Sequence, residues 1–155
     1  MQLSKHLSRA EFERSDAATN YGINNTMNSG QLAKAMALAI NCFEPIREHL
    51  GKPIRVNSGY RSPALNKRIG GAPSSQHCAI NGAAIDLDLH DRDLFEWIID
   101  NVTFDQLIAE FPSGGKASWF HISFREGRNR KQVLVAIKKA GKTIYLPWSE
   151  GKNHF

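Results

Sequence analysis

Residues 57–86, NSGYRSPALNKRIGGAPSSQHCAINGAAID, constrain the fold of this chain more than any other stretch. They place Arg61, His77 and Asp86 among glycines, prolines and small polar residues, a composition typical of loops that position functional side chains. His77 and Asp86 offer an imidazole and a carboxylate, both of which bind first-row metals. We therefore expect the fold to be organised around this stretch.

A second imidazole, that of His121, lies in the run SWFHISF at 118–124, whose alternation of apolar and polar residues predicts a strand. Two histidines and one carboxylate leave the fourth tetrahedral position open, as in catalytic rather than structural zinc sites. A lone histidine in a strand is more often a core or surface residue than a ligand. The three side chains form a site only if the fold brings their separate elements together, and spacing alone does not establish this.

Length and composition predict one globular domain that can bury a core. The chain has 155 residues, of which 41% are hydrophobic and 23% charged. Cys42 falls in an apolar helical pattern and is expected to be a small core residue. Cys78 directly follows His77, and adjacent residues rarely reach the same metal, so it is expected to be a bystander. Two such cysteines do not make a disulfide framework.

The formal charge of +5 and the pI of about 9.4 would attract nucleic acid, anionic wall polymers or acidic membranes. Charge does not choose among these partners, and a solvated basic surface explains it equally well. No apolar run approaches the ~20 residues that span a bilayer. The start, MQLSKHLSRAEFERSD, lacks the apolar region of a secretory signal, so we expect a cytoplasmic protein that reaches other compartments by host lysis or by packaging in a particle.

Periodicity predicts helices in the first part of the chain and strands in the last part. The helices are expected at 31–50, with Pro45 kinking or splitting it, at 63–69 with Ser62 as N-cap, and at 91–100. The strands are expected at 53–57 and 83–89 and within 104–111, 118–124, 131–138 and 142–148, with a tight turn at 140–142. Residues 1–29 form a polar lead-in. This order predicts an α+β fold with antiparallel strands.

Four motifs together resemble the M15 peptidases, which include zinc D-Ala-D-Ala carboxypeptidases and the L-Ala-D-Glu endopeptidases of phage endolysins. They are SGYRSPALN at 58–66, GGAPSSQH at 70–77, GxAxD ending at Asp86, and WxH ending at His121. The resemblance implies a small helix-flanked antiparallel sheet like that of hedgehog-type zinc domains. It also implies one peptidase domain over 1–155, with 1–29 packed on it, and zinc held by His77, Asp86 and His121.

The sequence departs from the family pattern between its first two ligands. Four residues separate His77 from Gly82 where the family has two, so we expect a bulge to absorb the extra length. Asp88 is predicted to lie on the same strand face as Asp86 and is the alternative ligand, although the GxAxD register favours Asp86. His90 is a spare imidazole whose position is more typical of a helix entry or the surface.

The general base is a second departure. Related enzymes often have Glu or Asp three residues before the last histidine, where this chain has Ser118. Many relatives carry a glutamate at the end of a run like DQLIAE, which points to Glu110. A hairpin around 113–115 would place Glu110 roughly opposite His121. Asp105 is expected to be farther away and structural.

The remaining candidate residues lie near the first ligand. Arg61 is expected to hydrogen-bond a substrate carbonyl or carboxylate with its planar fork of donors, and the alternative is a structural salt bridge. Ser75 and Gln76 are expected to line the site or orient His77. Trp119 is expected to pack in the core.

These features predict a zinc peptidase that acts as a monomer on peptidoglycan stem peptides, of phage origin, without a membrane span or nucleic-acid partner. One alternative is a non-catalytic zinc-binding structural or adaptor domain, such as a virion component. Another is a nucleic-acid-binding protein that uses KQVLVAIKKAGK at 131–142. That run is short and lacks interleaved aromatics, so it is more typical of a solvated hairpin.

Overall fold

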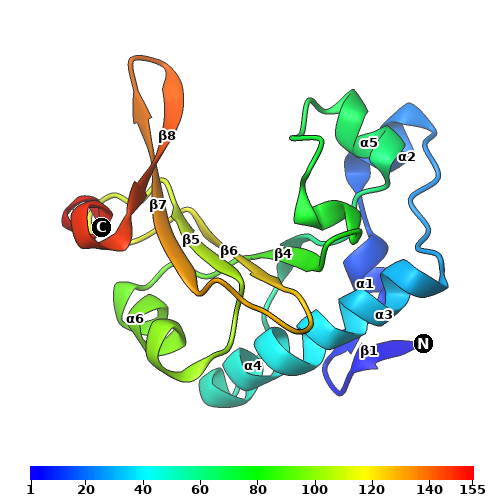
Figure 1. Cartoon of the computed structure of the whole chain (residues 1–155), viewed down its shortest axis with the longest axis horizontal. Coiled ribbons are helices and arrows are strands. Elements are labelled where there is room, and N and C mark those ends of the chain that lie inside the picture. The colour runs from blue at the N-terminus through cyan, green and yellow to red at the C-terminus, as the bar shows by residue number, and fades with distance from the viewer.

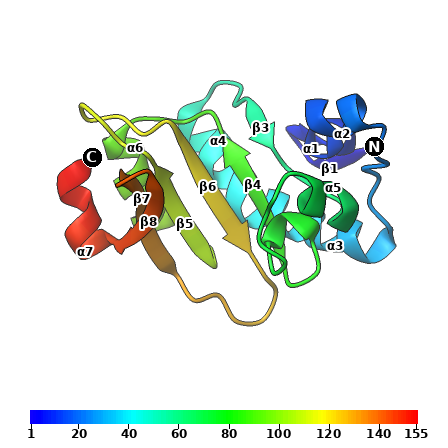
Figure 2. The ribbon, with the colours of Figure 1, turned by 90° about the horizontal axis from the view of Figure 1, so that it is seen from above.

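A six-stranded sheet forms the centre of the computed structural model, which describes residues 1–155 (Figure 1). Its strands lie in the order β3-β4-β6-β5-β7-β8, and the view from above shows β4, β6 and β5 side by side (Figure 2). The strand bounds are β3 Val56–Ser58, β4 Ala83–Leu87, β5 Gln106–Glu110, β6 Trp119–Phe124, β7 Gln132–Lys139 and β8 Lys142–Pro147. The predicted α+β class, with helices beside a small sheet, is confirmed.

One strand pair differs from the antiparallel sheet that the sequence predicts. β5 and β7 are parallel, whereas the other four neighbouring pairs are antiparallel. β6 and β7 follow one another in the chain but do not form a hairpin, because β7 is not hydrogen-bonded to β6. Loop 125–131 crosses the end where β5 begins, and β7 then runs beside β5 in the same direction. The sheet is therefore mixed.

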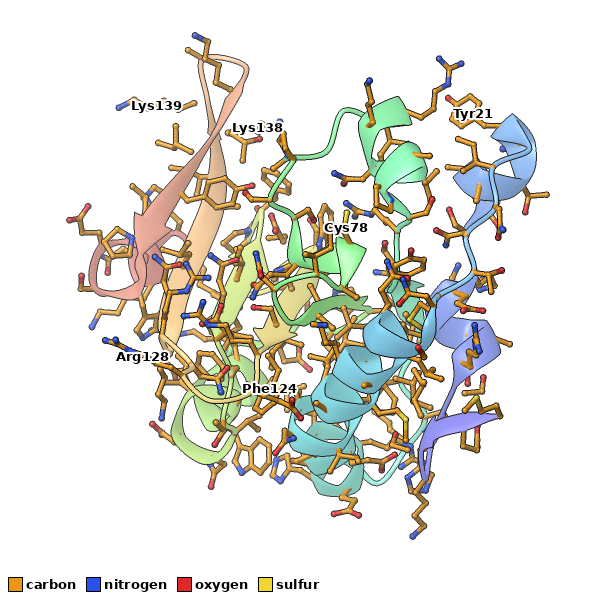
Figure 3. All side chains as sticks on the ribbon, turned by 45° about the vertical axis from the view of Figure 1, so that its right-hand side comes forward. Tyr21, Cys78, Phe124, Arg128, Lys138 and Lys139 are labelled. Carbon is orange, nitrogen blue, oxygen red and sulfur yellow. The ribbon has the colours of Figure 1, made fainter.

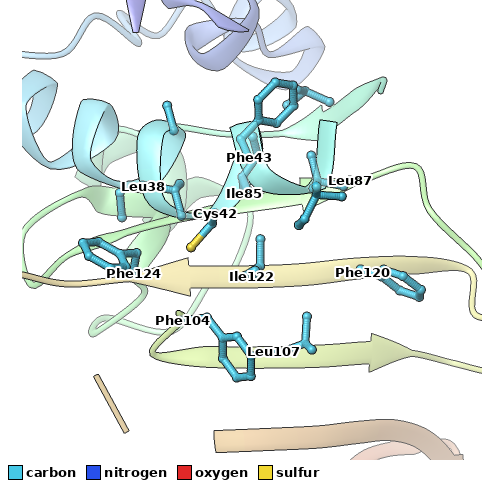
Figure 4. Packing of buried hydrophobic residues seen from close by; sticks show 14 of the residues in the cluster. Leu38, Cys42, Phe43, Ile85, Leu87, Phe104, Leu107, Phe120, Ile122 and Phe124 are labelled. Atoms are coloured by element: carbon cyan, nitrogen blue, oxygen red, sulfur yellow. The ribbon is translucent and has the colours of Figure 1, made fainter. Parts of the chain in front are cut away.

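The two faces of the sheet differ in character because side chains alternate along each strand. One face carries Ile85, Leu87, Leu107, Phe120 and Ile122, all completely buried. Leu38, Cys42 and Phe43 from the long helical segment pack against this face (Figure 4). The opposite face carries Asp86, Glu110 and His121, so the same alternation that builds the core presents the polar side chains together.

The long helical segment contains a π turn instead of a break. It runs as α3 Ser29–Leu38, the π turn η1 Ala39–Phe43 and α4 Glu44–Leu50. In the π turn the Glu44 N–H donates to the Ala39 carbonyl. Pro45 has no N–H and would clash with the carbonyl four residues before it in a regular α-helix. The wider π turn accommodates the proline, so the helix is irregular at the predicted position but is not split there.

The first 29 residues pack against residues 59–60, which directly precede Arg61. Their elements are β1 Gln2–Ser4, β2 Leu7–Ser8, α1 Arg9–Glu13 and α2 Asp16–Tyr21. Phe12 is fully buried in the main core, and its carbonyl accepts a 2.7 Å hydrogen bond from the Tyr60 N–H. A Cβ on Gly59 would lie 2.7 Å from the Phe12 ring, so the close approach depends on glycine there.

The remaining helices are short and frame the sheet. They are α5 Pro63–Arg68, the 3₁₀ turn η2 Gln76–Cys78, α6 Arg92–Asn101, α7 Trp148–Gly151 and the 3₁₀ turn η3 Lys152–His154. The Ser62 hydroxyl caps α5 as predicted, accepting from the Leu65 N–H. The last predicted strand, 142–148, ends one residue early, because Trp148 begins α7. The ring centroids of Trp148 and Phe95 lie 5.1 Å apart. None of the helices is long and apolar enough to cross a membrane.

Candidate metal centre

Two neighbouring strands bring Asp86 and His121 together. They are direct partners in the antiparallel pair of β4 and β6, and the Nδ1 atom of His121 lies 2.9 Å from Oδ1 of Asp86. The turn η2 adds His77, whose Nε2 atom lies 3.4 Å from Oδ2 of Asp86. One ligand atom from each of the three residues lies within 4.8 Å of the others.

The environment of His77 prepares it as a ligand. A carbonyl can only accept, so the 2.7 Å contact between Nδ1 of His77 and the Gly59 carbonyl places the proton on Nδ1 and leaves the Nε2 lone pair free. Burial lowers the pKa of His77, with Asp86 opposing part of the effect. The ring is therefore neutral near pH 7. A histidine that donates one ring N–H to a carbonyl and keeps the lone pair of its other nitrogen free is typical of metal-binding histidines.

Asp86 is ionised and surrounded by cationic or polar groups. Burial alone would raise the pKa of Asp86, but His77 and His121 outweigh it and hold this pKa well below its usual range. Arg61 adds a contact of 3.5 Å from Nη2 to Oδ2. Tetrahedral ligands about 2.1 Å from zinc lie roughly 3.4 Å apart, as Nε2 of His77 and Oδ2 of Asp86 do, and the 2.9 Å contact between His121 and Asp86 is a hydrogen bond that a bound ion would replace. The donor set and its spacing therefore fit zinc.

The extra residues between His77 and Gly82 form a turn. The predicted bulge does not lie between His77 and Asp86, because β4 pairs with β6 without a register shift from Ala83 to Leu87, and the shift opposite Asp86 and Leu87 lies in β3, between Val56 and Ser58. The chain instead makes η2 and then places Ala79 in the left-handed region, with φ 53°. Cys78 is buried within this turn and is not part of the ligand group, as expected.

The alternative ligands lie outside the group. Asp88 follows the end of β4, and its carboxylate lies 3.1 Å from Nε2 of His90. The other ring nitrogen of His90 donates to the Ala117 carbonyl at 2.9 Å. Of the two aspartates that the sequence left open, Asp86 is the one that meets both histidines.

Glu110 lies on the same sheet face as the ligand group but two residues along the strand from the position that the sequence predicted. In the β5–β6 pair, Glu110 is opposite Trp119, and Ile108 is opposite His121. Glu110 is therefore a diagonal neighbour of His121. Its residue exposure is 8%, and burial raises the pKa of Glu110 to about 7, with Asp86 adding to the shift and His121 opposing it. Such a carboxyl group can accept or donate a proton near neutral pH.

An open cleft of about 790 Å³ contains these side chains. One side is formed by residues of the segment before β4, including Ser75 and Gln76. The other side is formed by β7 and β8, including Leu134 and Tyr145. Figure 3 marks the first segment at Cys78 and the hairpin at Lys138 and Lys139. All seven predicted site residues line this cleft: Arg61, Ser75, Gln76, His77, Asp86, Glu110 and His121.

Two of these residues make contacts that define their positions. The Ser75 hydroxyl accepts from the His77 N–H at 3.3 Å and so begins η2. The Gln76 amide donates to the Asn81 carbonyl at 2.9 Å and to Oδ2 of Asp105 at 3.0 Å. Gln76 thus ties the turn that carries His77 to a buried carboxylate.

Asp105 is held by two arginines. Nη2 of Arg130 lies 2.8 Å from Oδ2 of Asp105, and Nε of Arg125 lies 3.6 Å from Oδ1. Burial alone would raise the pKa of Asp105, but the hydrogen bonds from Arg130 outweigh it and lower this pKa to about 2. These contacts agree with the structural role that the sequence indicated.

The cleft residues that the sequence did not predict include four large side chains: Trp119, Arg125, Arg130 and Tyr145. The core position expected for Trp119 is wrong, because it shares the open face with His121 and stacks edge-on against Phe111 at 5.7 Å. The alternation of WFH already placed Trp119 and His121 on one face, so that signal was available. Tyr145 and the arginines reach the cleft through strand order and loop path, which the sequence does not reveal.

Comparison with known proteins gives one match to a family and none to a curated protein. The model of the family described as Peptidase M15 matches residues 5–123. The matched region contains the ligand group, Arg61 and Glu110, and it ends before loop 125–131, β7 and β8. The chain therefore belongs to the M15 peptidase family.

Proposed function

We propose that this M15 family member is a zinc peptidase of phage origin that hydrolyses peptide bonds in peptidoglycan stem peptides, as a D-Ala-D-Ala carboxypeptidase or an L-Ala-D-Glu endopeptidase. The observation that carries the proposal is the convergence of His77, Asp86 and His121 beside Glu110 in one open cleft. We further propose that it acts as a monomer and reaches the cell wall by lysis or as part of a particle.

His77, Asp86 and His121 would hold the zinc ion in this proposal. Bound zinc supplies Lewis-acid chemistry, polarising the scissile carbonyl and lowering the pKa of water toward ~7. The hydrogen bond from His77 to the Gly59 carbonyl keeps the Nε2 lone pair directed toward the other two ligands. Asp86 contributes a negative charge that is held in place by Arg61.

Glu110 would be the general base. It would accept a proton from the attacking water and transfer it to the leaving amine, and its raised pKa suits both steps because neither protonation state is strongly favoured near pH 7. No other carboxyl group of the cleft is free for this task. Asp86 belongs to the ligand group, and Asp105 is bound by Arg130.

Arg61 would orient the substrate from the other side of the ligand group. Its Nε donates to the Ser58 hydroxyl at 3.2 Å and its Nη2 approaches Asp86, which fixes the guanidinium plane at the cleft. The planar fork can then hydrogen-bond a substrate carbonyl or carboxylate. Ser75 and Gln76 would hold η2 in place and contribute to the substrate surface.

The longer turn after His77 supports a second candidate, a non-catalytic zinc-binding domain of the same fold. Mass analysis of peptides released from defined peptidoglycan by the zinc-loaded protein separates the two. The proposal predicts release of D-Ala, or of fragments with a new D-Glu N-terminus, which disappears in Glu110→Gln. A zinc-containing protein that releases no peptide from any wall type would instead identify the non-catalytic domain.

A further inference from the structure

Strand pairing fixes the order of the side chains along the cleft, so its two ends carry different residues. Along the open face, Ile108 and His121 form a middle row, and Glu110 and Trp119 form the next row toward one end. Gln106, which pairs with both Ser123 and Gln132, lies toward the other end. Two residues along a strand span about 7 Å, so groups at the two ends meet different parts of a bound peptide.

The end beyond Gln106 is basic. Arg125 and Arg130 line the cleft there, with side-chain exposures of 39% and 48%, and both approach Asp105, whose side chain is 1% exposed. One carboxylate faces two guanidinium groups, which leaves a net positive charge. A guanidinium stays ionised at any physiological pH, so this charge is permanent.

Arg125 is held in a fixed position by its surroundings. Its backbone N–H donates to Oδ1 of Asn129 at 3.0 Å, and its side-chain Nε donates to the backbone carbonyl of Arg128 at 2.7 Å. A Cβ on Gly82 would lie 2.7 Å from Cβ of Arg125, so only glycine lets the start of β4 pack this closely against it. Because the side chain is already ordered, a ligand loses little of its binding energy to immobilising it.

The opposite end of the cleft offers aromatic and neutral groups. Phe111, Trp119 and Tyr145 line it, together with Thr143. Tyr145 pairs with Ala136, which pairs with Glu110, so its phenol extends over the row that contains the proposed base. Apart from Arg61 beside the ligand group, the Arg125–Arg130 end therefore offers a free substrate carboxylate a cationic position within this cleft.

We propose that Arg125 and Arg130 form a carboxylate-binding subsite that selects stem peptides whose γ-linked glutamate has a free α-carboxylate over those in which it is amidated. The inference rests on the peptidoglycan substrate proposed above. Asp105 precedes Ile108 by three residues, or about 10 Å of strand, and a peptide extends by about 3.3–3.6 Å per residue. In the D-Ala-D-Ala carboxypeptidase reading, two residues separate the glutamate from the scissile bond, which fits this distance. In the L-Ala-D-Glu reading the glutamate adjoins the bond, so we assign the subsite to the carboxypeptidase reading.

The test compares two synthetic stem pentapeptides that differ only in a free or an amidated glutamate α-carboxyl group. Binding is measured by calorimetry on the zinc-loaded Glu110→Gln protein, so that no cleavage interferes. We expect about tenfold tighter binding of the free acid, as charge-assisted hydrogen bonds imply. Adding Arg125→Gln should remove this preference while binding of the amidated peptide stays unchanged.

Arg128→Gln in the same background is the matched control. Arg128 is an exposed residue of the same loop that does not line the cleft, and its loss changes the net charge by the same amount (Figure 3). The tenfold preference should survive in this variant. Equal binding of the two peptides, or equal effects of Arg125→Gln and Arg128→Gln, would overturn the subsite alone. Failure of both peptides to bind would overturn the proposed substrate and the subsite with it.

Discussion

Two aspartates in the cleft, Asp86 and Asp105, are both buried and both lie against nitrogen-bearing side chains, but they are suited to different tasks. Asp86 lies against the imidazoles of His77 and His121, whereas Asp105 lies against the guanidinium groups of Arg125 and Arg130. Imidazoles can become neutral and present a lone pair to a metal, but guanidinium groups cannot. The partner residues, more than burial, make one aspartate a candidate ligand and the other a structural anchor.

Glu110 provides a third environment on the same face. It is as buried as Asp86, but no cationic group makes an ion pair with it in the structure. Its pKa consequently rises to about 7, whereas the pKa of each aspartate falls. The candidate base, the candidate ligand and the anchor thus differ mainly in what surrounds each carboxylate.

The largest expected effect is on catalysis, from Glu110→Gln. The amide keeps the size of the side chain but cannot accept a proton, and loss of a general base typically lowers the rate by about 10²–10⁴. Zinc content, measured by elemental analysis, should match the parent because Glu110 is outside the ligand group. Cleavage of wall peptides at the parental rate would show that another group is the base.

The same substitution should stabilise the metal-free protein at high pH. The folded-state pKa of about 7 exceeds the ordinary value of 4.5, so folding favours the protonated form and stability falls as pH rises from 4.5 through 7. Above that window the difference is roughly 3 kcal/mol, which Glu110→Gln removes. Chemical denaturation at pH 8 should find the variant more stable than the parent, and at pH 4 the two should converge. A variant less stable at pH 8 would contradict the raised pKa.

Asp105→Asn should have the opposite effect on stability. The pKa of Asp105 is lowered from 3.8 to about 2, so its ionised form contributes roughly 2 kcal/mol above pH 4, and this contribution disappears as pH falls through 2. Denaturation at pH 7 should find the variant less stable by about this amount, with zinc content unchanged. Loss of zinc in a folded Asp105→Asn protein would show that the two aspartates are not independent.

The smallest expected effect comes from Arg61→Lys. Arg61 is the one guanidinium in contact with Asp86, so its substitution tests whether this contact stabilises the fold or positions substrate. Arg61→Lys keeps the positive charge but loses the planar fork, so activity should fall by about tenfold or more while thermal stability and zinc content stay nearly unchanged. If Arg61→Lys lowers the melting temperature by as much as Asp105→Asn does, Arg61 is structural and does not bind substrate.

The sequence was sufficient for the parts of the site that depend on local patterns. The alternation in AAIDL and WFHIS placed Asp86 and His121 on one strand face each, and Ser62 was correctly predicted to cap its helix. Family motifs then supplied the convergence of the two strands, which local patterns do not contain.

The failures arise where long-range pairing or loop path decides the outcome. The positive φ angles of Phe111, Gly114 and Gly115 lie in the connection between β5 and β6 and accompany a register that pairs Glu110 with Trp119. The parallel pairing of β5 with β7 depends on the path of loop 125–131. Tyr145 and Arg125 reach the cleft only through this topology, so no local signal marked them.

The most direct test of the contrast between Asp86 and Asp105 is zinc titration of three metal-free proteins by calorimetry: the parent, Asp86→Asn and Asp105→Asn. An amide in place of Asp86 removes an ionised ligand, whereas an amide in place of Asp105 leaves the ligand group intact. We predict about one zinc ion per chain for the parent and for Asp105→Asn, and almost none for Asp86→Asn. A parent that binds no zinc, or an Asp86→Asn protein that binds it as tightly as the parent, would contradict the assignment of this group as the metal centre.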